Sequence, residues 1–505
     1  MSSNINNINN TSTKPIKKMI LWTKVNNCKS ASPHLKDNSK AQHKNIIMKN
    51  AKETKKAKVN TFINHNEKKI SPLKIFLLII LINYSEYLLF DDKEKFNRKY
   101  SKILKELDNN LRKSELRIAV YTITISGGGR GRVTSILINS LYRIKRFKLY
   151  LFTDDPPEKN EYMIPNDTTR VLINNDLIQN IEKYKIDIFI YQRFNASHIK
   201  QLNNLKNTKV IFYLHSSIFT WIYSSLNLFK EIYTEFKNLK YVVNIIPYEN
   251  DYLFKKWGIR SFYLDNFVTY DYNSVVPSDL SEKEILMVGR ANNKNKRFNL
   301  GIEAMKFIVK EVPDSQLIII SKIRPKNIRD LIRSLNLEEK VKFAPYTLSP
   351  ELYLKKASLH IFPTNYESFG LVLCETKIYG IPNILLGLNY VSIAKGGTII
   401  IYDDSPETLA NNAIKILKNI RYRKKLGKEA RKSMKKFNNN ILFLKWVQLI
   451  LSIYKGDEYF ELLRKKRKKI SDEEAIFIIN SQVKFLQMRV PNLTNITFNE
   501  FVNLI

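Results

Sequence analysis

Short apolar runs alternate with helical stretches from residue 116 onward, and this alternation restricts the chain to a small set of folds. The runs form two series, within residues 116–270 and 284–436, separated by a turn-rich linker at 271–283. Strands that alternate with helices build parallel sheets through right-handed crossovers. We therefore predict the α/β class, with two doubly wound Rossmann-like domains facing each other across a cleft. Ligands of such sheets bind beyond the carboxyl ends of the strands. The expected strands are 117–122, 147–152, 186–191, 210–214, 241–246, 284–289, 316–320, 340–343, 359–362, 383–386 and 398–401.

The residues before the first series have a different composition. Residues 1–74 hold sixteen lysines, no arginine and three acids, which predicts a disordered basic tail. Residues 75–90 are mostly apolar and form a candidate membrane anchor, followed by a helical connector at 91–115. Sixteen helical residues span about 24 Å, less than a hydrocarbon core of ~30 Å, so an interfacial helix and a buried core helix are alternatives. We expect membrane association, single-pass with a cytosolic N-terminus if the segment spans, and otherwise a cytoplasmic protein.

The chain is strongly basic, with 84 Lys and Arg against 47 Asp and Glu and a net charge of +37. This charge indicates an anionic partner such as a phosphorylated substrate, anionic lipid or nucleic acid, and a general bias of composition is the alternative. The two cysteines, Cys28 and Cys374, exclude a disulfide framework. The six histidines show no metal-binding spacing, so we expect no metal site.

The most informative segment is 362–382. A strand ends there, a polar loop carries Glu367, and Gly370 allows a tight turn into a helix that holds Glu375. The sequence Gly-Ile-Pro at 380–382 then ends the helix. Carboxylates at such a position can accept hydrogen bonds from sugar hydroxyls, and a helix N-terminus favours anions such as a diphosphate. An isolated pair of this kind would more often be an N-capping acid and a solvated glutamate.

The whole segment closely resembles the E-x7-E motif of retaining glycosyltransferases of the GT-B fold and the family-four type, the glycosyl transferases group 1. Thr364 and Thr376 depart mildly from the Ser and Ala that the family commonly has. The residues in register are Pro363, Glu367, Phe369, Gly370, Glu375, Gly380 and Pro382.

This resemblance implies roles for particular residues. Arg290 and Lys296, in the sequence Val-Gly-Arg followed by Lys-Arg, match the two cations that bind the donor diphosphate in the family. Fixed cations stabilise the charge of a leaving diphosphate without a metal. His215, at the end of an expected strand, resembles the family's histidine near the donor sugar. The implied catalytic residues are Glu367 and His215, and the implied donor-binding residues are Arg290, Lys296, Glu375, Gly127, Gly128, Ser368, Phe369, Gly370 and Leu371.

Glycines also follow the first expected strand. Gly127–Gly129 is similar to the family's glycine-rich turn, with a helix expected to start near Arg132. Residues 437–460 look like the helix that crosses back to the first domain in this fold, and 461–505 form a basic, helical extension. The family's glycine after a later strand is replaced by Ser321-Lys322, which leaves the nucleotide base undetermined.

We therefore expect a retaining glycosyltransferase of the hexosyltransferase type that uses a nucleotide-sugar donor as substrate, with no cofactor and no metal. Its acceptor would be a saccharide, a lipid-linked sugar or a protein, and nucleic acid is an unlikely partner. Two alternatives remain: a basic nucleic-acid- or membrane-binding protein, and a sugar-nucleotide epimerase on the same fold. The first draws on the lysine-rich tail and the basic run at 464–469.

Overall fold

The computed structural model describes residue 101 and residues 115–173, 176–217, 234–247, 249–250, 258–292, 294–387 and 393–465. The expected basic tail, the apolar segment 75–90, nearly all of the connector 91–115 and the extension after 465 lie outside the described residues. Within the described ranges, no helix combines the length and apolar character needed to cross a membrane.

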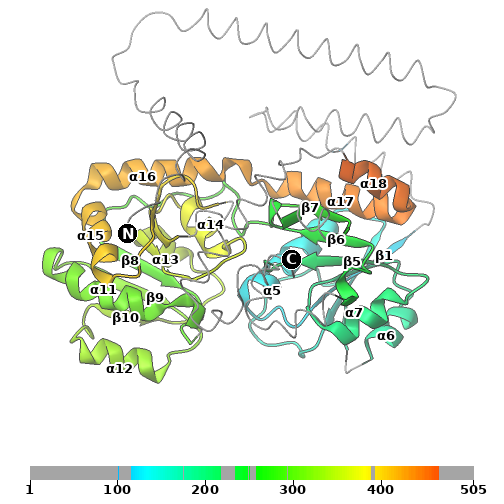
Figure 1. Cartoon of the computed structure of the whole chain (residues 1–505), viewed down its shortest axis with the longest axis horizontal. Helices are drawn as coiled ribbons and strands as arrows, with labels where there is room; N and C mark the ends of the chain where they lie inside the picture. The colour runs from blue at the N-terminus through cyan, green and yellow to red at the C-terminus, as the bar shows by residue number, and fades with distance from the viewer. Residues whose placement is uncertain are drawn as a thin grey trace, which may run out of the picture. The chain divides into compact units, whose positions relative to one another are not determined.

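The first sheet has seven parallel strands in the order β3-β2-β1-β4-β5-β6-β7. Figure 1 labels β1, β5, β6 and β7 of this sheet. Its strands are β1 (Leu116–Thr122), β2 (Phe147–Thr153), β3 (Thr169–Leu172), β4 (Ile188–Tyr191), β5 (Lys209–Leu214), β6 (Tyr241–Asn244) and β7 (Ser261–Tyr263). Among the described residues, the helices between them include α5 (Gly128–Leu141), α6 (Leu177–Lys183) and α7 (Ala196–Asn203).

The second sheet has six parallel strands in the order β10-β9-β8-β11-β12-β13. Its strands are β8 (Glu284–Val288), β9 (Gln316–Ile320), β10 (Val341–Ala344), β11 (Ala357–Phe362), β12 (Asn383–Leu386) and β13 (Thr398–Ile401). Its helices are η1 (Lys294–Lys296), α11 (Phe298–Glu311), α12 (Lys326–Ser334), α13 (Glu351–Lys356), α14 (Leu371–Ile378), α15 (Pro406–Lys418), α16 (Ile420–Ser433) and η2 (Met434–Lys436). The predicted α/β class with two doubly wound, Rossmann-like domains is confirmed.

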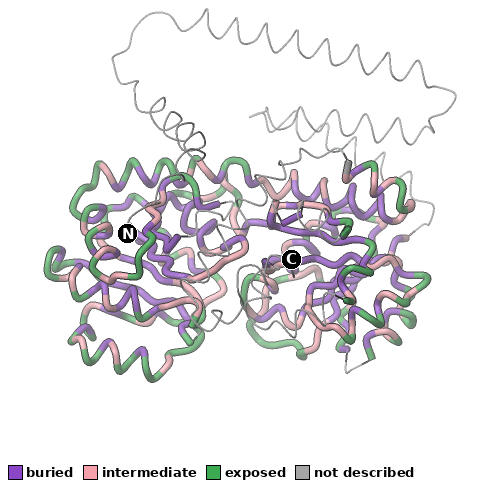
Figure 2. Tube along the Cα trace, viewed as in Figure 1, coloured by how far each residue is buried: buried purple, intermediate pink, exposed green. Residues whose placement is uncertain are grey.

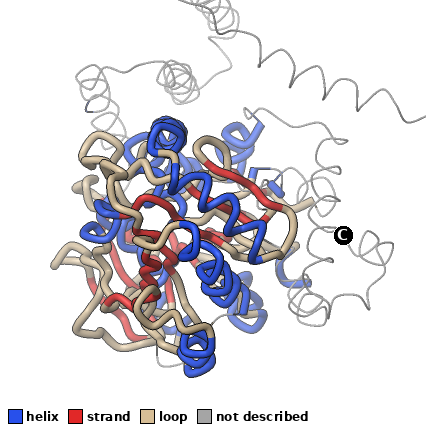
Figure 3. Tube along the Cα trace, turned by 90° about the vertical axis from the view of Figure 1, so that its left-hand side faces the viewer, coloured by secondary structure: helices blue, strands red, loops and turns tan. Residues whose placement is uncertain are grey.

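Helices flank the strands of these sheets, which explains why the strands read as continuous apolar runs (Figure 3). All four residues of β4 and all four of β12 are buried, and Figure 2 shows the strands as the buried interior. In the second domain, α11 and α15 pack together over one face, where Ile302 and Leu409 are fully buried with Ile285 of β8. Each domain therefore has a core built by helices on a parallel sheet.

The C-terminal helices α17 (Asn439–Lys455) and α18 (Asp457–Lys465) pack on the first domain. The resemblance implied one crossing helix at 437–460, whereas the structure has two helices, because α17 ends before Gly456. The indole of Trp446, fully buried in α17, meets the Tyr213 ring of β5 edge-on with centroids 4.9 Å apart. Tyr241 of β6 donates a hydrogen bond to Asp457 and packs edge-on against Phe460.

The structure differs from the sequence-based expectation at two points. The short strands β3 and β7 were not predicted, because each has only three or four residues and lies near or at a sheet edge. Helix α5 begins at Gly128 and not near Arg132, so Gly128 and Gly129 belong to its first turn. Gly131 permits this early start, because a Cβ there would lie 2.9 Å from the Thr124 carbonyl oxygen in the loop after β1.

Candidate functional site

In both sheets the strand order reverses between two central strands, β1 and β4 in the first and β8 and β11 in the second. Doubly wound sheets bind ligands beyond the carboxyl ends of the strands at this switch point. The residues that follow these four strands are therefore the first place to look for a site.

At the second switch point, Lys296 in η1 follows β8 and Glu367 follows β11. The ammonium nitrogen of Lys296 lies 2.7 Å from Oε2 of Glu367, and both side chains are about four-fifths buried. The Ser368 amide donates to Oε1 of Glu367 at 3.2 Å, and the Lys296 ammonium lies 5.1 Å from the centroid of the Phe362 ring. Two of the predicted site residues thus form one ordered ion pair at the sheet's carboxyl edge.

Asn295 fastens the two loops to each other, a role that the sequence did not reveal. Its side-chain amide donates to the Tyr366 carbonyl at 3.1 Å, and its side-chain oxygen accepts from the Tyr366 amide at 3.1 Å. Its own carbonyl accepts from the Asn365 amide at 2.9 Å. An asparagine in a Lys- and Asn-rich loop carries no distinguishing signal, so only the fold identifies it.

Arg290 follows β8 directly and is exposed. Within the described ranges no carboxylate pairs with it. Its charge acts to lower the pKa values of Arg130, in α5 of the first domain, and of Tyr366. Burial dominates for both groups, lowering the pKa of Arg130 and raising that of Tyr366. Arg290 therefore adds an uncompensated positive charge near the Lys296–Glu367 pair.

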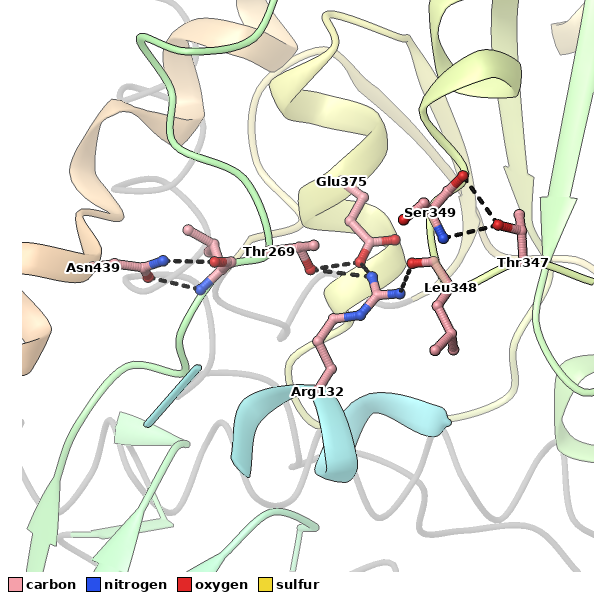
Figure 4. A network of polar contacts seen from close by, with 8 residues as sticks. Arg132, Thr269, Thr347, Leu348, Ser349, Glu375 and Asn439 are labelled. Carbon is pink, nitrogen blue, oxygen red and sulfur yellow. Dashed lines mark hydrogen bonds and ion pairs between the residues drawn. The ribbon is translucent and has the colours of Figure 1, made fainter. Parts of the chain in front are cut away.

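Glu375 of α14 is buried and forms an ion pair with Arg132 of α5, so this contact joins the two domains (Figure 4). The Thr269 hydroxyl donates to the same oxygen, Oε1, at 2.6 Å. The Arg132 guanidinium also donates to the Leu348 carbonyl at 3.0 Å and lies 4.9 Å from the centroid of the Tyr162 ring. The sequence placed Glu375 correctly on a helix after Gly370 but did not reveal its partner.

His215, directly after β5, belongs to a hydrogen-bond chain in the first domain. Its Nε2 lies 2.5 Å from Oε1 of Gln192, whose amide nitrogen donates to the Thr134 hydroxyl at 2.9 Å. That hydroxyl donates to the Arg130 carbonyl at 2.9 Å. Because Gln192 presents an oxygen to the ring, Nε2 carries the proton. Burial, with a smaller effect of the Arg130 charge, holds the pKa of His215 well below its usual value, so the ring is neutral.

Glycines at the start of α5 lie against the second domain. A Cβ on Gly127 would lie 2.8 Å from the Tyr346 hydroxyl oxygen, and one on Gly129 would lie 3.1 Å from Cδ1 of Leu371. Gly128 has φ +71°, which favours glycine. Three of the predicted donor-binding residues, Gly127, Gly128 and Leu371, therefore lie in this region.

The remaining predicted donor-binding residues lie at the start of α14. The Ser368 hydroxyl accepts a hydrogen bond from the Ser217 amide of the first domain at 2.8 Å. Gly370, with φ +82°, leads into α14 as predicted. The Phe369 side chain is buried and packs edge-on against Phe437, with centroids 5.6 Å apart, so it supports the loop from within the core.

No group of three His, Cys, Asp or Glu side chains with the arrangement of a metal site occurs among the residues that the structure describes.

The comparisons with known proteins agree with this geometry. Residues 272–433 match the family described as Glycosyl transferases group 1. The chain is 29% identical over 115 residues to an uncharacterized glycosyltransferase of Haemophilus influenzae. That match covers 22% of this chain and 32% of the relative, so the chain spans about a third of the length of this curated relative.

Two solved structures share the fold. Sucrose-phosphate synthase (tll1590) from Thermosynechococcus elongatus has a TM-score of 0.58 and 18% identity, covering 68% of this chain and 100% of that chain. Alr3699/HepE of Anabaena, in complex with UDP-glucose, has a TM-score of 0.54 and 14% identity, covering 67% and 100%. These likenesses show a GT-B arrangement of two Rossmann-like domains.

Proposed function

We propose that this protein is a retaining glycosyltransferase that moves a hexose from a nucleotide diphosphate sugar to a hydroxyl acceptor. The observation that carries the proposal is the Lys296–Glu367 pair, which lies at the second switch point and inside the segment that matches the family. The structural neighbour in complex with UDP-glucose supports a nucleotide sugar as donor.

In this proposal the two cations of the second domain stabilise the leaving diphosphate. Negative charge develops on the phosphate oxygens as the glycosidic bond breaks, and positioned cations lower the barrier in a site that excludes water. Arg290 is exposed at the end of β8, whereas Glu367 orients the ammonium of Lys296. Retention requires that the acceptor hydroxyl attack the face from which the diphosphate leaves. Glu367 and His215 would contact the donor sugar.

Glu375 would bind the ribose. Its Oε1 accepts hydrogen bonds from Arg132 and Thr269, which leaves Oε2 to accept a hydrogen bond from a ribose hydroxyl. Arg132 would then act as a positioning residue, because it holds the carboxylate in one orientation from the opposite domain.

The acceptor and the location of the protein are part of the proposal. We propose that residues 75–90 attach the protein to a membrane, which would give it access to a lipid-linked or saccharide acceptor there. Fractionation of the full chain and of a chain starting at Asp91 tests this. Resistance of the full chain to carbonate extraction, with the shortened chain soluble and folded, supports the attachment, and a full chain soluble at low salt contradicts it.

The central experiment is a thermal-shift screen of the full chain against UDP-, GDP- and ADP-sugars, since a ligand that binds the folded state raises its melting temperature. The anomeric configuration of the product, followed by NMR, then tests retention. Stabilisation by one donor series together with a product of retained configuration supports the proposal. Absence of any shift and any product with all three series contradicts it.

A further inference from the structure

Arg130 is a half-buried cation for which the described part of the chain provides no carboxylate partner. It is the third residue of α5, and its Nε atom is buried without a hydrogen-bond partner. Within the described ranges, its guanidinium forms no ion pair. Buried polar groups are nearly always hydrogen-bonded, and a charge is costly to bury without a counter-ion. The Arg130 guanidinium would therefore be stabilised by an anionic ligand.

The charges around Arg130 make the position still more positive. Burial lowers its pKa most, and the like charges of Arg193 and Arg290 lower it further. Arg193 is neutralised by Asp154, whose carboxylate oxygen lies 2.5 Å away. The one histidine in this group, His215, is neutral. Among the residues that the structure describes, Arg130 and Arg290, from opposite domains, thus remain as two cations without carboxylates.

The backbone around Arg130 is held firmly. Its carbonyl accepts from Thr134, which accepts from Gln192, and Gln192 in turn accepts from His215. Arg130 and Thr134 lie in α5, the helix that follows β1, and Gln192 follows β4, so these hydrogen bonds link the two segments that leave the first switch point. An uncompensated arginine on a fixed backbone at a switch point is the arrangement expected of a binding group.

We propose that Arg130 and Arg290 together bind a phosphate group between the two domains, which extends the proposed function by assigning a phosphate-binding residue to the first domain. The guanidinium would donate to phosphate oxygens in a planar, bidentate manner that a lysine cannot reproduce. The phosphate could belong to the donor diphosphate or to a phosphorylated acceptor, and the experiment below separates these sources.

The test compares wild type, Arg130→Gln and Arg193→Gln in the full chain by isothermal titration calorimetry. The probes are UDP, GDP, ADP, inorganic diphosphate and uridine, followed by glycerol 3-phosphate added to the nucleotide-saturated protein. Arg193→Gln is the matched control, because Arg193 lies nearby but already has a carboxylate partner. Arg130→Gln should weaken binding of the phosphate-bearing probe by about 10- to 100-fold and leave uridine unchanged.

The outcomes are distinguishable. Loss confined to the nucleoside diphosphate and inorganic diphosphate assigns the donor as source, and loss confined to glycerol 3-phosphate assigns the acceptor. Equal binding of all probes by wild type and Arg130→Gln overturns the inference, as does an equal loss in Arg193→Gln. If wild type binds none of the nucleotides, the proposed function itself fails.

Folding of the variant is checked separately. Removing an uncompensated, half-buried charge should leave the melting temperature of Arg130→Gln unchanged or raise it. Arg130→Lys keeps the charge without the planar fork and should restore only part of the affinity. A lower melting temperature together with full affinity would show that Arg130 is structural, and would overturn the inference.

Discussion

The two switch points of this molecule have the same topology but connect their neighbouring segments through different interactions. In the second domain, the loops after β8 and β11 are joined by the ion pair of Lys296 and Glu367 at 2.7 Å. In the first domain, helix α5 is joined to Gln192, which follows β4, by a neutral hydrogen bond through Thr134, and among the described residues Arg130 has no counter-ion. At the second switch point Lys296 is thus ordered by a carboxylate, whereas Arg130 at the first switch point and Arg290 beside the Lys296–Glu367 pair have no carboxylate partner among the described residues.

This difference indicates that paired and unpaired cations can have different roles in a binding site. A compensated pair holds its geometry at little electrostatic cost, so it suits a position that must be ordered before the substrate arrives. An uncompensated cation is disfavoured until an anion binds, and binding then gains what burial had cost. We infer that the Lys296–Glu367 pair supplies positioning and that the two unpaired cations, Arg130 and Arg290, supply affinity for negative charge.

The largest expected effect comes from breaking the contact that joins the two halves. Arg132→Met leaves the carboxylate of Glu375 buried without its cation, which should cost about 3–5 kcal/mol of unfolding free energy. Chemical denaturation of the wild type and the variant measures this. The double variant Arg132→Met/Glu375→Met should be less destabilised than the sum of the single variants, because both charges are removed together. Additive losses would show that the two side chains do not interact.

Removing Lys296 from its ion pair with Glu367 tests the second switch point through the rate of sugar transfer. Lys296→Ala should lower kcat for sugar transfer by about 10²–10³-fold, because a positioned charge opposite the leaving diphosphate is lost. Lys283→Ala is the matched control, since Lys283 also pairs with a carboxylate, Asp314, but on the surface of the same domain. Similar values of kcat for the two variants would contradict the assignment of Lys296 to the donor-binding site.

The sequence predicted the two halves unequally well. Glu367, Gly370 and Glu375 lie within one short segment, so their spacing alone placed them on a loop and the following helix. Thr134 and Gln192 form their hydrogen bond only because β1 and β4 are neighbours in the sheet, and no spacing along the chain predicts that.

The fold shows the same pattern. The central strands were predictable because burial on both faces makes them continuous apolar runs, as in β12. Strand β3, with only one buried residue, carries no such signal. The start of α5 was misplaced because three successive glycines read as a loop, although close packing of Gly131 on Thr124 draws them into the helix.

A smaller effect concerns the stability of the helix that carries Glu375. Lys377 of α14 is fully buried and donates hydrogen bonds to the carbonyls of Ile393 and Lys395, and burial lowers its pKa to about 7. Between this value and the ordinary pKa of lysine near 10.5, the unfolded chain binds more protons than the folded one. The free energy of unfolding is therefore reduced by the burial of Lys377 when the lysine of the unfolded chain is charged. Its full value is present above pH ~10.5 and is lost progressively as the pH falls toward 7.

Melting temperatures measured from pH 7 to pH 9.5 test this sign. The wild type should gain stability with rising pH, and Lys377→Met should flatten the curve. Lys425→Met, which alters an exposed lysine of α16, should keep the slope of the wild type and so controls for the general loss of positive charge. Parallel curves for Lys377→Met and wild type would show that the buried lysine does not titrate in this range.

The smallest expected effect is that of a chelator. If Arg290 and Lys296 neutralise the leaving diphosphate, as the second domain's half of the site suggests, transfer should proceed at an unchanged rate in EDTA. Arginine and lysine supply fixed positive charge that needs no reorganisation when the bond breaks, which is the role that a divalent cation plays in other transferases. The measurement is the initial rate with EDTA, with EDTA followed by Mg²⁺ or Mn²⁺, and with no addition.

A rate that falls in EDTA and recovers only with the metal would show that the cations of the two domains are insufficient to neutralise the diphosphate. The comparison between the paired and the unpaired cations would then have to include a metal ion as a further positive charge.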